Sequence, residues 1–367
     1  MKATTYAAAL ATVGLLALSA CLHDSGDGAS ERPMTGETDA ATATLNDARG
    51  TNADQIRDVT TQAALSQPQF GSVFQSAAVD LASASGVSAA SDGTDLTITV
   101  SRDDGSALTL NSGSDPSDAS GTSDSPIAGH SAQAWIVLNI DTEGISVARA
   151  TVTANDSDAA DYLAVGYWMH IAGDLTEFSF TGAEIGAFAD GPELSLESPA
   201  SLPAQGTASY YGPALGAYAV LHGADGEGPP GSMESGEFNS SVELTADFAA
   251  NTIEGCVGCR DGVAVFGTLH DPDTGEATDV FFEDSGYRLH LDSANLAANG
   301  TFLGQQMRLE HSEYSFTSIG GAWGGQLSNI ADSAGDPRLV AGTFGTEATS
   351  AGGSEGAFLG SFIGTKE

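Results

Sequence analysis

A series of short apolar runs, separated by turn-forming residues, limits the folds that this chain can adopt. After residue 205, about eight to ten such runs follow one another, with Gly, Pro, Asp or Asn between them. Gly alternates with aromatic residues in several runs, most clearly over 300–304, 321–325 and 356–360. Glycine weakens a flat strand, but it allows the sharp bending and close packing of a small barrel. The series therefore predicts an all-β sandwich or barrel over residues 205–367.

Residues 65–195 carry a second, less regular set of strand-like runs. Leu96–Val100 alternates apolar and polar residues, and Ala107–Leu110 follows after an Asp-Asp-Gly turn, which predicts a hairpin. The most apolar run is Tyr162–Ile171, which we expect in a core because its Tyr and Trp side chains offer large apolar areas. The Pro-bearing stretch 191–203 separates the two sets. We therefore predict a distinct N-terminal β-domain over 65–195.

The N-terminus has the features of an export signal. A positive charge at Lys2 precedes an apolar stretch that is too short for a spanning helix, which needs about 20 residues. The residues Leu18-Ser19-Ala20-Cys21 resemble the lipobox of bacterial lipoproteins, in which the Cys thiol receives a diacylglycerol and becomes the new N-terminus. An ordinary signal peptide with a chance Cys is the alternative. We predict a signal peptide over 1–20 and lipidation of Cys21.

Residues 21–64 are polar and lack a sustained period of 2 or 3.6, which predicts a flexible acidic tether. The residue after Cys21 is Leu22, and the lack of Asp there favours the outer membrane, on its periplasmic or cell-surface side. The net charge of −38, from 49 acidic and 11 basic residues, makes nucleic acid and anionic lipid surfaces poor partners. Solubility in salty surroundings explains this charge most simply, and attraction to a basic ligand is the alternative.

Three segments near the C-terminus carry a family resemblance, and each is a Gly-rich strand-like run. They are Gly321-Ala-Trp-Gly-Gly-Gln-Leu, Val340-Ala-Gly-Thr-Phe-Gly-Thr and Phe358-Leu-Gly-Ser-Phe-Ile-Gly-Thr-Lys. They resemble strands of the transferrin-binding-protein-like β-barrel lipoproteins of Gram-negative bacteria, with Thr346 and Thr365 where Ala is common. The resemblance implies a small eight-stranded antiparallel β-barrel that follows an N-terminal handle-like β-domain.

The same resemblance implies a membrane-anchored, non-catalytic binding lipoprotein that takes part in the acquisition of iron, haem or another solute. A structural or adhesive cell-surface lipoprotein with no small ligand is the alternative. The shared motifs are structural, so they transfer no ligand-contacting residue, and we expect no cofactor. The expected partners are the membrane, through the N-terminal lipid, an unknown protein or an iron- or haem-type ligand, and an outer-membrane receptor or lipoprotein translocator.

Cys256 and Cys259 are the two cysteines that remain once Cys21 is lipidated. An exported protein folds in an oxidising compartment, so a disulfide is the default, and Gly255 and Gly258 allow the turn that the bond requires. A structural zinc site would need four ligands, and a thioredoxin-type motif would need a βαβ pattern. We predict a local disulfide, with metal binding and redox activity as the alternatives.

Other candidate motifs are incomplete. Asp271, Asp273 and Asp279 place oxygens as in part of a calcium loop, but Phe282 stands where that loop needs Glu, so a hairpin turn is the alternative. Ser354 lies in a G-x-S-x-G pattern, yet no helical segment follows as a nucleophile elbow requires. We therefore expect a hairpin loop there and no enzyme. The histidines in or beside predicted strands are expected to be barrel or surface residues, namely His170, His290 and His311.

Overall fold

The structure is a computed structural model, and it describes most of the C-terminal half and separate segments of the N-terminal half. The predicted signal peptide, the lipidation site Cys21 and the predicted tether lie outside the described residues. Every regular element that the structure describes is a β-strand, which confirms the all-β fold class. No helix in this part of the chain is long and apolar enough to cross a membrane. The described residues are 80–81, 84–91, 95–102, 105–112, 121–124, 131–140, 144–154, 163–174, 179–191, 200 and 202–367 without 227, 272, 305 and 314.

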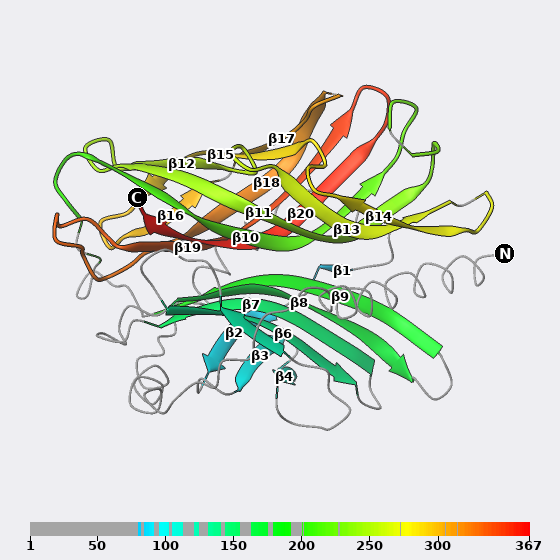
Figure 1. The fold of residues 1–367 in the computed structure, drawn as a ribbon, viewed down its shortest axis with the longest axis horizontal. Coiled ribbons are helices and arrows are strands. Elements are labelled where there is room, and N and C mark those ends of the chain that lie inside the picture. The colour runs from blue at the N-terminus through cyan, green and yellow to red at the C-terminus, as the bar shows by residue number, and fades with distance from the viewer. Residues whose placement is uncertain are drawn as a thin grey trace.

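The C-terminal half forms a closed antiparallel barrel (Figure 1). The order around the ring is β10-β20-β19-β18-β16-β15-β12-β11, and pairing of β10 with β11 closes it, so the barrel has the predicted eight strands. The strands of this half are β10 Thr207–Leu221, β11 Met233–Asp247, β12 Thr252–Val257, β13 Val263–His270, β14 Ala277–Phe282, β15 Tyr287–Leu296, β16 Thr301–Gly304, β17 Met307–His311, β18 Phe316–Leu327, β19 Leu339–Ser350 and β20 Glu355–Lys366.

Strand β11 has two successive partners along one side. Its C-terminal half pairs with β12, and its N-terminal half pairs with β13. Strands β12 and β13 therefore follow the same line and are interrupted by the loop 258–262. Before the loop, the second neighbour of β12 is β15. Beyond the loop, the second neighbour of β13 is β14, which is the last strand in the sheet order. The β13–β14 hairpin (residues 263–282) thus extends from the ring (Figure 1).

Aromatic rings fill the interior of the barrel. The ring of Phe358 lies 5.0 Å from Tyr287, 5.5 Å from Phe238 and 5.7 Å from Tyr218, measured between centroids. Gly360 faces this interior, where a Cβ atom would lie 2.8 Å from Cζ of Phe238 and 2.9 Å from Cζ of Phe344. The backbone oxygen of Leu215 would lie only 2.5 Å from the same atom, so glycine is required at this position because the backbone of β10 and the rings occupy its side-chain space. The alternation of Gly with aromatic residues therefore reflects close packing in the barrel, as predicted.

The N-terminal strands form two sheets. The larger has the order β1-β9-β8-β7-β6-β5, and the smaller has the order β2-β3-β4. The predicted hairpin of Leu96–Val100 with Ala107–Leu110 is confirmed as the pair β3–β4. The strands are β1 Asp80–Leu81, β2 Ala84–Ser91, β3 Leu96–Arg102, β4 Ala107–Asn111, β5 Gly121–Asp124, β6 Ser131–Ile140, β7 Gly144–Ala154, β8 Leu163–Asp174 and β9 Ser179–Asp190.

The larger N-terminal sheet lies between the smaller sheet and the barrel, so the chain has three layers (Figure 1). Alternate residues of a strand point to opposite faces. Along β8, Trp168 is buried against residues of β2–β4, whereas its neighbour Tyr167 is buried towards the barrel with Ala217 and Ala219 of β10. The most apolar run of this half therefore belongs to two cores at once, one on each face of the sheet.

Glu237 of β11 joins the barrel to the N-terminal sheet. Nη1 of Arg149 in β7 donates to its Oε2 at 3.0 Å, and the hydroxyl of Tyr167 in β8 donates to its Oε1. Only 11% of the Glu237 side chain and 23% of the Arg149 side chain are exposed. The two layers therefore share a largely buried ion pair as well as an apolar contact.

Three buried tyrosines predict a loss of stability in alkali. Burial raises the pKa of Tyr167, Tyr210 and Tyr218 above the usual value of 10.0. Above about pH 10 the unfolded chain therefore loses phenolic protons that the folded chain keeps, so rising pH favours unfolding. We expect the free energy of unfolding in urea to fall steadily above about pH 10. A value that stays constant to about pH 11 would contradict these burials.

Candidate functional site

The closed interior of the barrel is occupied by its own side chains. An eight-stranded barrel is only just wide enough to be filled in this way. The rings of Tyr218, Phe238, Phe344, Phe358 and Phe362 are all at most 1% exposed. A ligand site would therefore have to lie on the outside of the barrel, at its ends or on the N-terminal layers.

One end of the barrel holds a buried polar cluster around Glu234. Its carboxylate accepts a hydrogen bond from the Tyr218 hydroxyl at 2.8 Å and lies 3.3 Å from Nε2 of His222. The backbone N–H of Gly228 donates to Nδ1 of His222 at 3.3 Å, so the imidazole proton sits on Nε2 and points to Glu234. These polar groups satisfy one another, and sequence analysis did not identify them.

Ser354 lies in the loop between β19 and β20. Its hydroxyl donates to Oδ1 of Asp225 at 2.7 Å, and it accepts the backbone N–H of Gly223 at 2.9 Å. Hydrogen bonds from Ser350 and Ser354 lower the pKa of the Asp225 carboxyl to about 2. The predicted hairpin loop is therefore present, and the serine fastens it to the neighbouring loop through a carboxylate.

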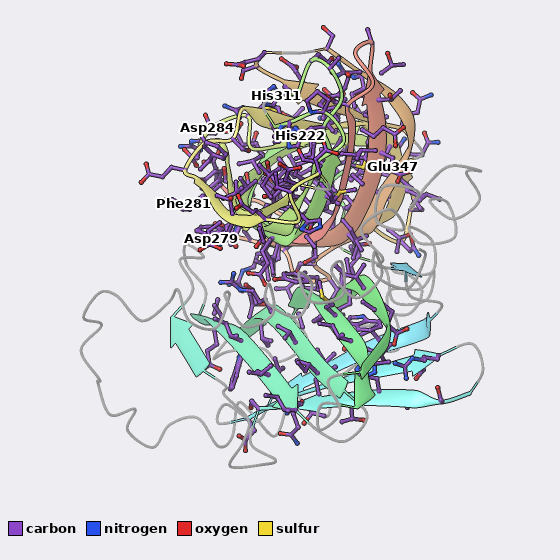
Figure 2. All side chains as sticks on the ribbon, turned by 90° about the vertical axis from the view of Figure 1, so that its right-hand side faces the viewer. His222, Asp279, Phe281, Asp284, His311 and Glu347 are labelled. Carbon is purple, nitrogen blue, oxygen red and sulfur yellow. A yellow bond between two sulfur atoms is a disulfide. The ribbon has the colours of Figure 1, made fainter. Side chains whose placement is uncertain are left out.

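The β13–β14 hairpin presents large apolar side chains to solvent. Phe281 is 55% exposed and Phe282 is 45% exposed, and among the described residues the other large hydrophobic side chains are more buried than these two. Figure 2 shows Phe281 near Asp279 and Asp284 at the outer edge of the barrel. Sequence analysis missed both phenylalanines as site residues. The available signal was a Val-Phe-Phe run enclosed by acidic residues.

The predicted calcium-loop residues fall in the same hairpin. The Asp271 carboxylate accepts the backbone N–H of Asp273 at 2.8 Å and that of Thr274 at 3.4 Å, and Gly275 has a φ of 72°. This is the hydrogen bonding of a tight Asx turn. Asp279 lies farther along, in β14 opposite Thr268. The hairpin-turn alternative accounts for this geometry, and calcium binding stays a prediction.

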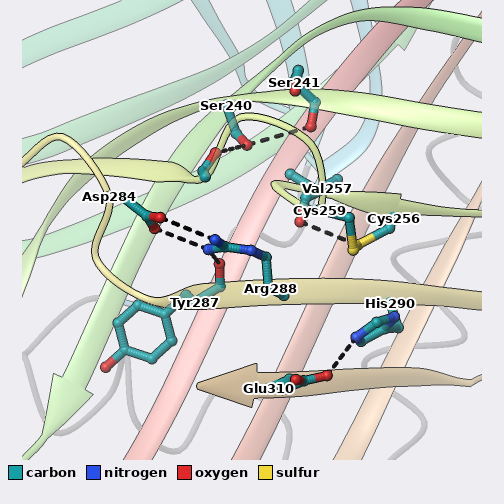
Figure 3. Close-up of a disulfide and its surroundings, with 11 residues drawn as sticks. Ser240, Ser241, Cys256, Val257, Cys259, Asp284, Tyr287, Arg288, His290 and Glu310 are labelled. Atoms are coloured by element: carbon teal, nitrogen blue, oxygen red, sulfur yellow. Dashed lines mark hydrogen bonds and ion pairs between the residues drawn. A yellow bond between two sulfur atoms is a disulfide. The ribbon is translucent and has the colours of Figure 1, made fainter. Parts of the chain in front are cut away.

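Cys256 and Cys259 are joined as the predicted disulfide, with their Cα atoms 5.8 Å apart (Figure 3). His290 lies beside them because β15 pairs with β12, which places it opposite Cys256. One ligand atom from each of the three residues lies within 4.8 Å of the others. Nε2 of His290 is 2.8 Å from a carboxylate oxygen of Glu310. Reduction of the disulfide would therefore leave three soft or borderline ligands together, which keeps metal binding as an alternative.

The disulfide predicts protection of both thiols. Alkylation of the denatured protein without reductant should leave Cys256 and Cys259 unmodified, and prior reduction should expose both. Mass spectrometry of the peptide that contains them measures this directly. Modification of both residues without reductant would contradict the disulfide and favour the metal alternative.

The other histidines named from the sequence do not join this cluster. His170 in β8 has its Nδ1 2.8 Å from the Ser146 hydroxyl. The ring of His311 in β17 lies tilted against that of Tyr287, with centroids 4.6 Å apart, and its Nε2 is 2.9 Å from the backbone oxygen of Ser285. Each therefore has a partner within its own sheet or an adjoining loop.

An ion pair beside the disulfide fixes the loop that leads out of the hairpin. Arg288 contacts both carboxylate oxygens of Asp284, at 2.9 and 3.0 Å (Figure 3). This guanidinium lowers the pKa of the Asp284 carboxyl to about 2. The backbone N–H of Ser285 also donates to the oxygen of Val263 at 2.9 Å. The hairpin is therefore anchored to the barrel at its base, while its tip and outer strand face solvent.

Comparison with protein families and with curated proteins finds no match for this sequence. Among solved structures, one described as intact Ap-TbpB with its N and C lobes is similar, with 12% sequence identity and a TM-score of 0.30. The match covers 78% of this chain and 56% of that chain, so this chain spans little more than half of its length.

Proposed function

We propose that this chain is a lipid-anchored, non-catalytic binding protein of the outer membrane, held at the periplasmic or cell-surface side by Cys21. Its ligand is a protein, or a carrier of iron, haem or another solute, which it presents to an outer-membrane receptor. The observation that carries this proposal is the filled barrel with an exposed aromatic hairpin. A barrel whose interior is packed serves as a rigid support for surface contacts, and rigid scaffolds with exposed loops are typical of binding proteins.

The filled barrel favours a protein ligand over a small one. Pockets for small ligands are concave and enclose most of the ligand surface. The barrel interior has its space taken by aromatic rings that contact one another. Exposed aromatic side chains are instead typical of the centres of protein interfaces.

Uptake measurements in a strain that lacks the gene test this proposal. The probes are radiolabelled iron supplied as a ferric chelate, as haem and as an iron-loaded carrier protein. We expect uptake from at least one source to fall in this strain and to be restored by the wild-type gene. A gene that encodes the Cys21→Ser variant should not restore uptake, and the variant protein should appear in the soluble fraction. Unchanged uptake with weaker adhesion of the cells would support the structural or adhesive alternative.

A further inference from the structure

Strand β14 has a backbone edge that its own sheet leaves open. It is the terminal strand of the order that the described strands form, and β13 is its only neighbour there. The N–H of Asp271 donates to the oxygen of Glu276 at 3.0 Å, which makes this a hydrogen-bonded pair of the ladder. Such pairs alternate with pairs whose amides point away. The backbone groups of Ala277, Asp279 and Phe281 therefore point towards the open edge.

Apolar side chains stand on both faces of this edge. Phe281 is opposite Phe266 in the ladder, and their ring centroids are 5.0 Å apart on the outer face. Phe282 is opposite Val265, which points into the barrel, so Phe282 lies on the other face with Val280. A strand added beside β14 would therefore meet an apolar side chain on each face, in addition to backbone groups with which none of the described strands pairs.

The charge of the hairpin selects the kind of strand that can be added. Residues 271–284 contain six carboxylates and no Lys or Arg. A second copy of this chain would bring two such sets together, and like charges that face each other across strands destabilise the pair. A segment that carries basic side chains would be attracted by the same carboxylates. The charge pattern thus opposes self-association and favours a basic partner.

We propose that β14 is a docking edge, to which an extended, basic segment of a partner protein adds as a further strand. Its backbone pairs with Ala277, Asp279 and Phe281, its basic side chains lie on the outer face beside Asp279 and Glu283, with their aliphatic stems on Phe281, and its apolar side chains lie on the other face beside Val280 and Phe282. This inference deepens the proposed function, because it names the surface and the chemistry of the protein ligand.

Three labelled peptides test this proposal by fluorescence anisotropy on the full chain with Cys21→Ser, at roughly physiological ionic strength. The first alternates lysine and valine. The second has glutamate in place of lysine. The third is the lysine peptide with an N-methyl group on every residue, which removes the amide donors along both edges. We expect the first peptide to bind, and the second and third to bind at least roughly tenfold more weakly. Equal binding of the N-methylated peptide would overturn strand addition.

Protein variants locate the binding. Phe281→Ser with Phe282→Ser, and separately Asp279→Lys with Glu283→Lys, should each weaken binding of the lysine peptide at least roughly tenfold. The matched control is Glu254→Lys with Glu313→Lys, two exposed acidic residues outside the hairpin, which makes the same change in net charge. Circular dichroism and thermal midpoints check that each variant is folded. Equal loss in the control and the hairpin charge variant would overturn the assignment to β14.

The uptake assay separates this inference from the proposed function. If the hairpin variants no longer bind the lysine peptide and also fail to restore uptake, the result supports both the binding function and the docking edge. If the variants no longer bind the peptide but restore uptake fully, the binding function stands, and β14 is not its docking edge.

Discussion

Replacing Phe358 with alanine should destabilise the protein by about 3–5 kcal/mol, the usual cost of removing a buried aromatic ring. Phe358 is fully buried, and its ring contacts Tyr218, Phe238 and Tyr287, which come from three other strands. Truncation would leave a cavity in the centre of the barrel that these rings could fill only partly. Urea unfolding followed by tryptophan fluorescence and circular dichroism measures the change.

The matched control is the same substitution at Phe281. Its side chain is more than half exposed, so Phe281→Ala should change the free energy of unfolding by about 1 kcal/mol or less. A similar loss at both positions would show that the hairpin phenylalanine is part of the core. A small loss at Phe358 would show that the barrel interior is not tightly filled.

Replacing Glu237 with alanine should lower the free energy of unfolding by about 2–3 kcal/mol. This loss is smaller than that expected for a fully buried ion pair, because Arg149 is partly exposed. The substitution removes the carboxylate that accepts hydrogen bonds from the Arg149 guanidinium and the Tyr167 hydroxyl between the two layers. The double variant with Arg149→Ala should lose less stability than the sum of the two single variants, because each single variant already removes the ion pair between the two side chains.

This substitution should also weaken the contact of the N-terminal sheet with the barrel. We expect limited proteolysis to cut the N-terminal half of the Glu237→Ala variant earlier than that of the wild type, while the barrel resists. Glu254→Ala, an exposed carboxylate on β12, is the control and should change neither measurement. Additive losses in the double variant would contradict the shared ion pair.

The barrel could be predicted because its signals are local. Turn residues between short apolar runs and the alternation of Gly with aromatic residues act over a few positions, and Gly360 shows why this pattern is required. The number of strands in the barrel could not be obtained by counting runs, because β12 and β13 are separate runs in the sequence but lie end to end along β11. The prediction of eight strands came from the family resemblance.

Positions that depend on long-range pairing could not be predicted. The strand Ala277–Phe282 has two adjacent phenylalanines, and nothing local tells that it stands at the end of the sheet with both rings in solvent. In the same way, His290 meets Cys256 only through the pairing of β12 with β15. Tyr167 and Trp168 are neighbours in the sequence, yet they belong to different cores because they lie on opposite faces of β8.

Hydrogen exchange at single-residue resolution shows whether a basic strand is bound along the open edge of the hairpin. The full chain with Cys21→Ser is measured with and without saturating lysine–valine peptide. Pairing of the basic strand with this edge should slow exchange at the amides of Ala277, Asp279 and Phe281, with little change at amides already paired in the barrel. Unchanged exchange at these three amides under saturation would contradict it.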